Sequence, residues 1–268
     1  MDPKILFRVC IFQLLPVLFV PCLYAQPGKD DLTVGKSILI RSEILDETRP
    51  VYIRLPGNYS ESQKSYPVLY VFDAELNFIP VCGVVHLLER LQNFPGIIVA
   101  GIPNTDRMRD LTPTWDRDFH IGGGGDVFIR FMREELFPYR EQNFRTAPFR
   151  ILEGHSISGM FALYIFTEDT SLFDAFIAVS PSMYWDRQIM LAKLDSFLTE
   201  NPTLEKQLYL TLANEPSFMY VHETVDILKK NAPAGLQWSF RMDTTGTHET
   251  APIRSTLEGL RWFFPNYY

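Results

Sequence analysis

The sequence predicts an α/β fold with a mostly parallel sheet, and three observations support this. Two segments that alternate apolar and polar residues come first, five continuous apolar segments of strand length follow, and segments with helical spacing separate those five. Continuous apolar strands are typical of a parallel sheet that is covered on both faces. We therefore expect a mixed sheet with antiparallel N-terminal strands and helices on both faces.

The strands are expected in the following order. The alternating pair is SILIRSEIL (37–45) and PVYIRLP (50–56). The apolar strands are PVLYVFD (67–73), GIIVAGIP (96–103), RILEGH (150–155), AFIAVSP (175–181) and LYLTLAN (208–214), and LQWSFRM (236–242) is the last. An alternating strand has one face in water, whereas a continuous apolar strand has neither.

The helices are expected where apolar residues recur three and four positions apart. These segments are VVHLLERL (84–91), VFIRFMREELFPYREQ (127–142), MFALYIF (160–166), QIMLAKLDSFL (188–198), YVHETVDILKK (220–230) and TLEGLRWFF (256–264). Because strands and helices then alternate, the loops that follow the strands are the expected place for a ligand site.

The first 25 residues are predicted to be a secretory signal peptide. Lys4 and Arg8 give a cationic start, an apolar stretch follows over residues 9–24, and Ala25 is a small residue at the expected cleavage point. A retained membrane anchor is the alternative, but the stretch is shorter than the roughly 18 to 20 residues that span a bilayer. We expect cleavage, no stable membrane insertion afterwards, and a periplasmic or secreted protein.

Residues 26–268 are expected to form a single domain. The chain carries a formal charge of −7, which repels phosphate backbones, so nucleic acid is not an expected partner. Cys10 and Cys22 fall in the predicted signal peptide and leave Cys82 alone, which allows neither an intrachain disulfide nor a cysteine metal site. The sequence gives no indication of the oligomeric state.

The sequence GHSISG, residues 154–159, lies between an expected strand and an expected helix. It approaches the pattern G-x-S-x-G of a nucleophile elbow, in which a serine sits on a tight strand-to-helix turn. Gly154 satisfies the first position, while Ser158 replaces the second glycine. An ordinary turn of small residues is the alternative, but the position between strand and helix favours Ser156 as a nucleophile over that reading.

A serine nucleophile needs a base, and in this architecture the partners follow it in the order acid, then histidine. Two histidines follow the elbow. His222 lies within an expected helix, whereas His248 lies in the polar loop TTGTHET after the last strand. His248 is therefore the predicted base, and a surface histidine is the alternative.

The acid that orients the histidine should lie on a loop after a strand. Glu215 ends the segment LYLTLANE and is the first choice; Asp186 is the second and Asp243 the third. A solvated glutamate remains a rival explanation for Glu215. Two backbone N–H groups should bind the oxyanion, and the predicted donors are Ile157 after the nucleophile and Ala74 after the segment PVLYVFD.

These residues give the chain a resemblance to the putative-esterase family of α/β hydrolases, which includes esterase D-like enzymes and siderophore (enterochelin-type) esterases. The resemblance rests on YPVLYVFDAE, GIPNTDRMRDLTPT, ILEGHSISGMFALY, AVSPSMYWD and the histidine loop followed by GLRWFF. It implies the α/β-hydrolase fold, a small-molecule ester as substrate, and no metal or organic cofactor. Some siderophore esterases of the family use only a serine–histidine pair, which leaves the role of Glu215 open.

The chain departs from the family at two positions. Ser158 stands where members usually have glycine, and Glu249 follows the histidine where glycine is frequent. Three functions are therefore weighed: a serine-dependent carboxylic-ester hydrolase, an acyltransferase of the same fold, and a ligand-binding protein in which catalysis has faded. The first is favoured.

Candidate substrate contacts come from two loops. Arg107 and Arg109 follow the segment GIIVAGIP and are candidates for gripping an anionic or catecholate-bearing substrate, unless they pair with neighbouring aspartates. Trp185 is a candidate to stack on an aromatic acyl group.

Overall fold

The computed structural model describes residues 33–90 and 94–267. The described residues from Val34 onward form one compact unit. The predicted signal peptide, residues 1–25, lies outside the described residues. Among the residues described, no helix is both long and apolar enough to cross a membrane.

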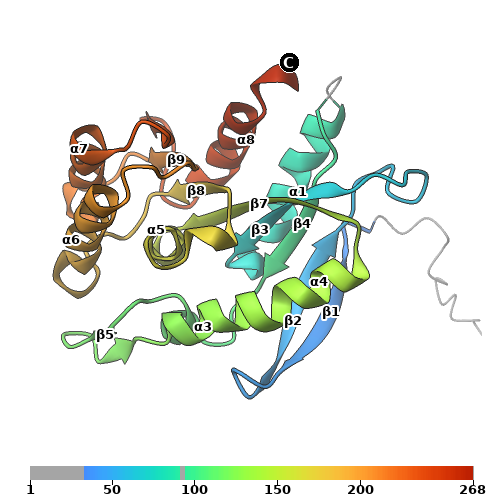
Figure 1. The fold of residues 1–268 in the computed structure, drawn as a ribbon, viewed down its shortest axis with the longest axis horizontal. Coiled ribbons are helices and arrows are strands. Elements are labelled where there is room, and N and C mark those ends of the chain that lie inside the picture. Colours follow the sequence, from blue (N-terminus) through green and yellow to red (C-terminus); the bar gives the residue numbers. More distant parts are fainter. Residues whose placement is uncertain (1–32, 91–93, 268) are drawn as a thin grey trace, which may run out of the picture. The chain divides into compact units, whose positions relative to one another are not determined.

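Eight strands form one mixed sheet in the order β1-β2-β4-β3-β7-β8-β9-β10 (Figure 1). The pairs β1–β2 and β2–β4 are antiparallel, and all other neighbours are parallel. The strands are β1 (Lys36–Ser42), β2 (Glu47–Arg54), β3 (Tyr66–Phe72), β4 (Ile98–Ile102), β7 (Thr146–His155), β8 (Ala175–Val179), β9 (Gln207–Leu212) and β10 (Gln237–Met242). The predicted mixed sheet is confirmed.

Helices cover both faces of this sheet, as predicted (Figure 1). The longer helices are α1 (Ala74–Arg90), α5 (Ile157–Glu168), α6 (Trp185–Glu200), α7 (Val221–Asn231) and α8 (Ala251–Phe263). Helix α3 (Gly125–Phe131), a π-helical turn (Met132–Leu136) and α4 (Phe137–Asn143) follow one another without a break. Helices α1 and α8 pack together on one face, and α5 packs on the other with α6 beside it.

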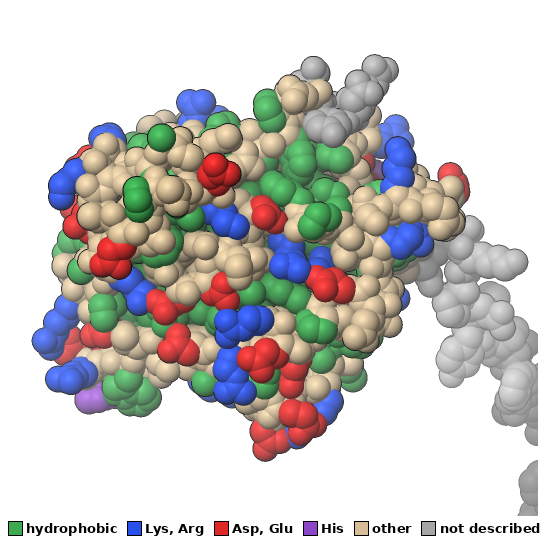
Figure 2. All heavy atoms as spheres, in the orientation of Figure 1, with side chains coloured by type: hydrophobic (Ala, Val, Ile, Leu, Met, Phe, Trp, Pro, Cys, Tyr) green, Lys and Arg blue, Asp and Glu red, His purple; other side chains and the backbone are tan. Residues whose placement is uncertain are grey.

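The sequence did not predict the smaller elements. They are α2 (Arg107–Asp110), the two-stranded sheet of β5 (Trp115–Asp116) and β6 (Ile121–Gly122), and the 3-10 turns Thr170–Leu172, Ser217–Met219 and Pro265–Tyr267. Such elements are too short to show a hydrophobic period. On the face that Figure 2 shows, acidic and basic side chains lie interspersed over the described residues.

Helix α1 begins ten residues before the helix that was predicted at 84–91. Pro80 lies inside it and cannot donate to the carbonyl of Leu76. The helix tolerates this loss because Leu76 is exposed, so that water can reach this turn. The buried residues of α1, by contrast, keep helical spacing along its whole length and hold it on the sheet.

Strand β7 passes into α5 through a very tight turn at Ser156, whose φ is 61° and ψ −119°. A residue other than glycine at positive φ is strained. A Cβ on Gly154 would lie 2.1 Å from the carbonyl oxygen of Ser158, and a Cβ on Gly159 would lie 2.8 Å from that of Val179. Both glycines are therefore needed for α5 to approach the sheet this closely.

The loops after the parallel strands leave from one edge of the sheet, since parallel strands share their carboxyl ends. Asp73 follows β3, Ser156 follows β7 and Ser180 follows β8. The loop with Glu215 follows β9, and the loop with His248 follows β10. The topology thus gathers the predicted site residues along one rim.

One strand residue is a buried carboxyl group. Glu153 in β7 is 2% exposed, and burial raises its pKa to about 8. Its Oε1 lies 2.6 Å from the hydroxyl of Thr256 in α8, a bond that partly opposes the rise. Glu153 is therefore protonated and neutral at pH 7.

We predict that Gly154→Ala destabilises the protein by about 1–3 kcal/mol, because the added methyl group overpacks the turn. Gly83→Ala is the matched control, since a Cβ at this position of α1 meets no atom within 4 Å. Urea unfolding of both variants and of the wild type measures the effect. Equal stability of the two variants would contradict the need for glycine at residue 154.

We predict that Glu153→Gln weakens the pH dependence of stability. The folded pKa of about 8 exceeds the ordinary value of 4.5, so between these pH values the unfolded chain loses a proton that the folded chain keeps. Wild-type stability should therefore fall as pH rises from 5 to 8, and the glutamine variant should lack this contribution. Urea unfolding at both pH values checks it; parallel pH profiles would show that Glu153 is not protonated.

Candidate active site

Ser156 and His248 line the same two clefts at the rim of the sheet. The larger cleft has a volume of about 580 Å³ and the smaller one about 250 Å³. Both side chains contribute to both walls, so the two clefts meet at this pair of residues. The sheet thus brings together two residues that lie far apart in the sequence.

Glu215 lies against His248, with Oε1 3.0 Å from Nδ1. The Glu215 side chain is 4% exposed. Burial by itself would raise its pKa, but the hydrogen bonds with His248 and Ser180 outweigh burial, and the pKa is lowered. An ionised carboxylate can only accept a hydrogen bond, so Nδ1 of His248 carries the proton and Nε2 is left for Ser156.

The hydroxyl of Ser156 is 3.1 Å from that of Ser182, which follows β8. Among the described residues, no hydrogen bond joins Ser156 to His248. In serine hydrolases this contact is often loose before substrate binds and tightens in the reacting complex. The structure therefore places Ser156 and His248 at the same clefts without a hydrogen bond between them.

His155, which precedes Ser156, packs against His248. Its ring centroid lies 4.3 Å from that of His248. Burial, and next the nearby His248, lower the pKa of His155 to about 4. The ring is therefore neutral at pH 7, so it supports the imidazole of His248 without adding a second positive charge to the site.

The other two candidate acids have different surroundings. Asp186 lies in a left-handed turn and does not line either cleft; its N–H donates to Asp116. Asp243 accepts hydrogen bonds from the N–H groups of Thr245 and Gly246. Of the three predicted acids, the structure therefore places Glu215 beside the histidine.

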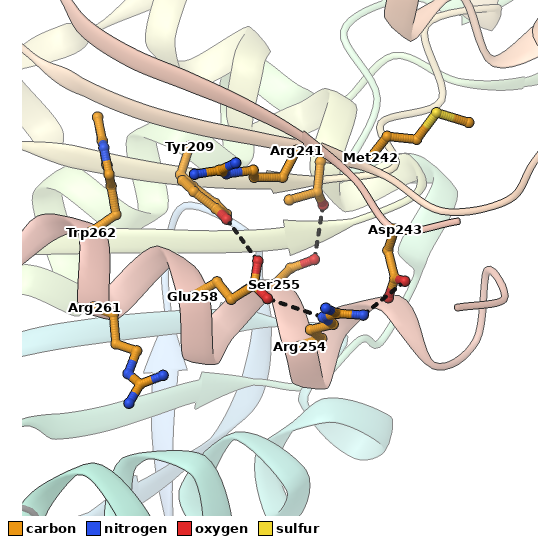
Figure 3. Close-up of a pocket in the computed structure, with 10 residues that line it drawn as sticks. Tyr209, Arg241, Met242, Asp243, Arg254, Ser255, Glu258, Arg261 and Trp262 are labelled. Carbon is orange, nitrogen blue, oxygen red and sulfur yellow. Dashed lines mark hydrogen bonds and ion pairs between the residues drawn. The ribbon is translucent and has the colours of Figure 1, made fainter. Parts of the chain in front are cut away.

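Asp243 instead shapes the loop that carries His248. Arg254 of α8 lies 3.1 Å from its Oδ1 and 3.0 Å from Oε1 of Glu258, so it ties the loop to the helix (Figure 3). These residues line a third cavity, of about 520 Å³, between β9, β10 and α8. That cavity contains neither Ser156 nor His248.

The two predicted oxyanion donors are the first residues of helices. Ala74 begins α1 and Ile157 begins α5. The first N–H groups of a helix have no partner within it, and within the described chain neither amide donates to another acceptor. Both amides are therefore unpaired at helix N-termini, as the predicted oxyanion role requires.

The structure gives the predicted substrate contacts other partners. Arg109 is bound by Asp110 at 2.6 Å and Glu47 at 2.8 Å and lines neither cleft, since ion pairing satisfies its guanidinium. Trp185 is 2% exposed and donates to the carbonyl of Thr114, so it belongs to the core. The guanidinium of Arg107 reaches the larger cleft, but it pairs with a buried aspartate, Asp73.

Sequence analysis missed most of the residues that line the clefts. The smaller cleft is lined by Ser182, Tyr184, Pro216, Phe218 and Met219 beside the predicted site residues. The larger one adds the apolar residues Leu76, Pro80, Pro252 and Ile253 and the polar residues Glu75, Asn77 and Glu249. Phe218 and Leu76 are exposed although they are apolar. Their positions in the segments that follow predicted strands were the sequence feature that could have identified them.

Within the residues that the structure describes, no three histidine, cysteine or acidic side chains are grouped to hold a metal ion. The arrangement instead consists of a strained serine, a histidine hydrogen-bonded to a carboxylate, and two unpaired backbone amides. This set of groups is able to activate a hydroxyl nucleophile and to stabilise an oxyanion.

Comparison with known proteins agrees with this arrangement. Residues 42–236 match the model of the family described as putative esterase. The chain is 30% identical over 155 residues to ferri-bacillibactin esterase BesA of Bacillus subtilis and 29% identical over 175 residues to a siderophore enterobactin esterase of Emericella nidulans. These matches cover 50% and 54% of this chain and 54% and 56% of the relatives, so the chain spans about half the length of the curated relatives it matches.

Solved structures extend the likeness. An IroE-like serine hydrolase from Shewanella oneidensis superposes with a TM-score of 0.83 at 30% identity, covering 87% of this chain and 81% of that one. The enterobactin esterase FES from Shigella flexneri has a TM-score of 0.69 at 20% identity, covering 86% and 59%, and shows the fold alone. The fold is that of the α/β hydrolases, and the chain belongs to the putative-esterase family.

Proposed function

We propose that this protein is a serine-dependent carboxylic-ester hydrolase that works through an acyl-enzyme. The observation that carries the proposal is the Glu215–His248 hydrogen bond at a rim where His248 and the strained Ser156 share both clefts. Membership of an esterase family supports the same reaction.

In the proposed reaction, the hydroxyl oxygen of Ser156 attacks the ester carbonyl while Nε2 of His248 takes the hydroxyl proton. The resulting oxyanion accepts hydrogen bonds from the N–H groups of Ile157 and Ala74. Glu215 stabilises the imidazolium that forms. His248 then gives the proton to the departing alcohol, and water attacks the acyl-enzyme by the same steps to release the acid and regenerate the serine.

For the substrate, we propose a siderophore-type or comparable acyl ester. Relatives named as a ferri-bacillibactin esterase and as a siderophore enterobactin esterase support this class. Arg107 and Arg109 do not support this substrate class as cationic contacts, because both are ion-paired. Cleavage of a cyclic catecholate trilactone by the purified protein tests the class directly, and hydrolysis of simple esters without trilactone cleavage would reduce the proposal to a general esterase.

We predict that Ser156→Ala and His248→Ala each lower the hydrolysis of p-nitrophenyl butyrate by about 10⁴-fold or more. Glu215→Gln should lower it by about 10²-fold or more, because glutamine stabilises the imidazolium less well. His222→Ala is the control, since this histidine is exposed on α7. Wild-type activity in the serine variant would reject Ser156 as the nucleophile.

A fluorophosphonate probe provides an independent measurement. We expect one adduct, located on Ser156 by mass spectrometry. An unlabelled protein that still binds a siderophore would instead identify a ligand-binding protein. Transfer of the acyl group to an added sugar in preference to water would identify an acyltransferase.

A further inference from the structure

We propose that Ser158, Asp73 and Arg107 form a clamp that positions the two oxyanion donors relative to each other. The proposal rests on the proposed esterase reaction and assigns these three residues to positioning, not to contact with the substrate. It also gives a function to Ser158, which replaces the second glycine of the elbow, and to Arg107, which the sequence analysis named as a candidate substrate contact.

The first half of the clamp joins the loop after β3 to the elbow. The hydroxyl of Ser158 lies 2.7 Å from Oδ2 of Asp73 and accepts a hydrogen bond of 2.8 Å from the N–H of His155. Its single proton has a second possible acceptor, the carbonyl of His155 at 2.9 Å, but the charged carboxylate is the stronger one. Ser158 is fully buried and Asp73 is 3% exposed, so water does not compete for this bond.

The second half of the clamp is the guanidinium of Arg107. Its Nε lies 2.7 Å from Oδ1 of Asp73 and its Nη2 lies 2.8 Å from Oδ2, which is a bidentate pair. Nη2 also approaches the carbonyl of His155 at 3.4 Å. The amide of Asn104 donates to Oδ1 of Asp73 at 2.7 Å. Each oxygen of the buried carboxylate therefore accepts two hydrogen bonds.

The sequence positions of these residues explain why the clamp acts on the oxyanion site. Asp73 directly precedes Ala74, and Ser158 directly follows Ile157, so the residues that carry the clamp adjoin both proposed donors. Asp73 has a φ of 52°, a strained conformation that persists only where contacts hold it. A glycine at residue 158 would have no hydroxyl to bind Asp73. The departure from the family pattern thus adds a contact at the site.

The expected consequence is kinetic. Loss of one oxyanion donor typically costs about 10²- to 10³-fold in turnover. Displacing a donor without removing it should lower turnover less than its loss does. We therefore expect Ser158→Ala and Ser158→Gly each to lower kcat about 10- to 100-fold, with KM changed less than about twofold. The buried carboxylate of Asp73 remains satisfied by Arg107 and Asn104 in these variants.

The experiment measures kcat and KM on p-nitrophenyl butyrate, with rates normalised to enzyme titrated by the fluorophosphonate probe. It also measures the inhibition constant of a trifluoromethyl ketone, whose adduct with the serine carries the same oxyanion. The inhibition constant should rise by about the factor by which kcat falls. Ser42→Ala is the matched control, because it removes a buried serine hydroxyl that binds the N–H of Leu45 at the end of the edge strand β1, outside both clefts.

A double-mutant cycle tests the link to Asp73. Asp73→Asn together with Ser158→Ala should cost less than the product of the two single effects, because both remove one contact. Wild-type kcat and inhibitor affinity in both Ser158 variants would overturn the clamp. So would a lower thermal midpoint alone, with normal kinetics per titrated site. Inactive Ser156→Ala beside fully active Ser158 variants would reject the clamp and leave the esterase intact, whereas active Ser156→Ala would reject the esterase itself.

Discussion

The tight turn between β7 and α5 is the constraint on which the rest of the site depends. It holds Ser156 at a φ of 61°, which an L-residue adopts only under strain. The close packing of Gly154 and Gly159 against neighbouring carbonyl groups stabilises this conformation. The turn also starts α5 one residue after the serine, so the unpaired amide of Ile157 directly follows Ser156. One backbone geometry therefore positions both the hydroxyl and the amide that the proposed reaction uses.

The hydrogen-bond and ion-pair partners of the ionisable groups near this rim determine which of these groups are charged. Glu153 and His155 lie in the same strand, are buried with little compensation, and stay neutral at pH 7. Glu215 and Asp73 are also buried, but hydrogen bonds and ion pairs keep their pKa values low. The carboxylate beside His248 is thus ionised while the imidazole of His155 remains uncharged.

The clefts show why family membership leaves the substrate open. The strands and the glycines of the elbow fix the position of Ser156. The loops that follow the strands form the walls of the clefts around it. Phe218 and Met219 line the smaller cleft, and Glu75 and Glu249 contribute to the larger one. Arg107 and Arg109, the candidate substrate contacts, are paired with carboxylates.

The sequence by itself determined the alternation of strands and helices, the antiparallel start of the sheet, and the positions of the elbow and of the histidine loop. These are local properties, because hydrophobic period and turn chemistry are read within a few residues. Only the tertiary structure decided that Glu215, and not Asp186 or Asp243, lies beside His248, that Trp185 is in the core, and that Ser158 binds Asp73. Each of these depends on which side chains meet across the sheet, and spacing along the chain carries no information about a partner more than thirty positions away.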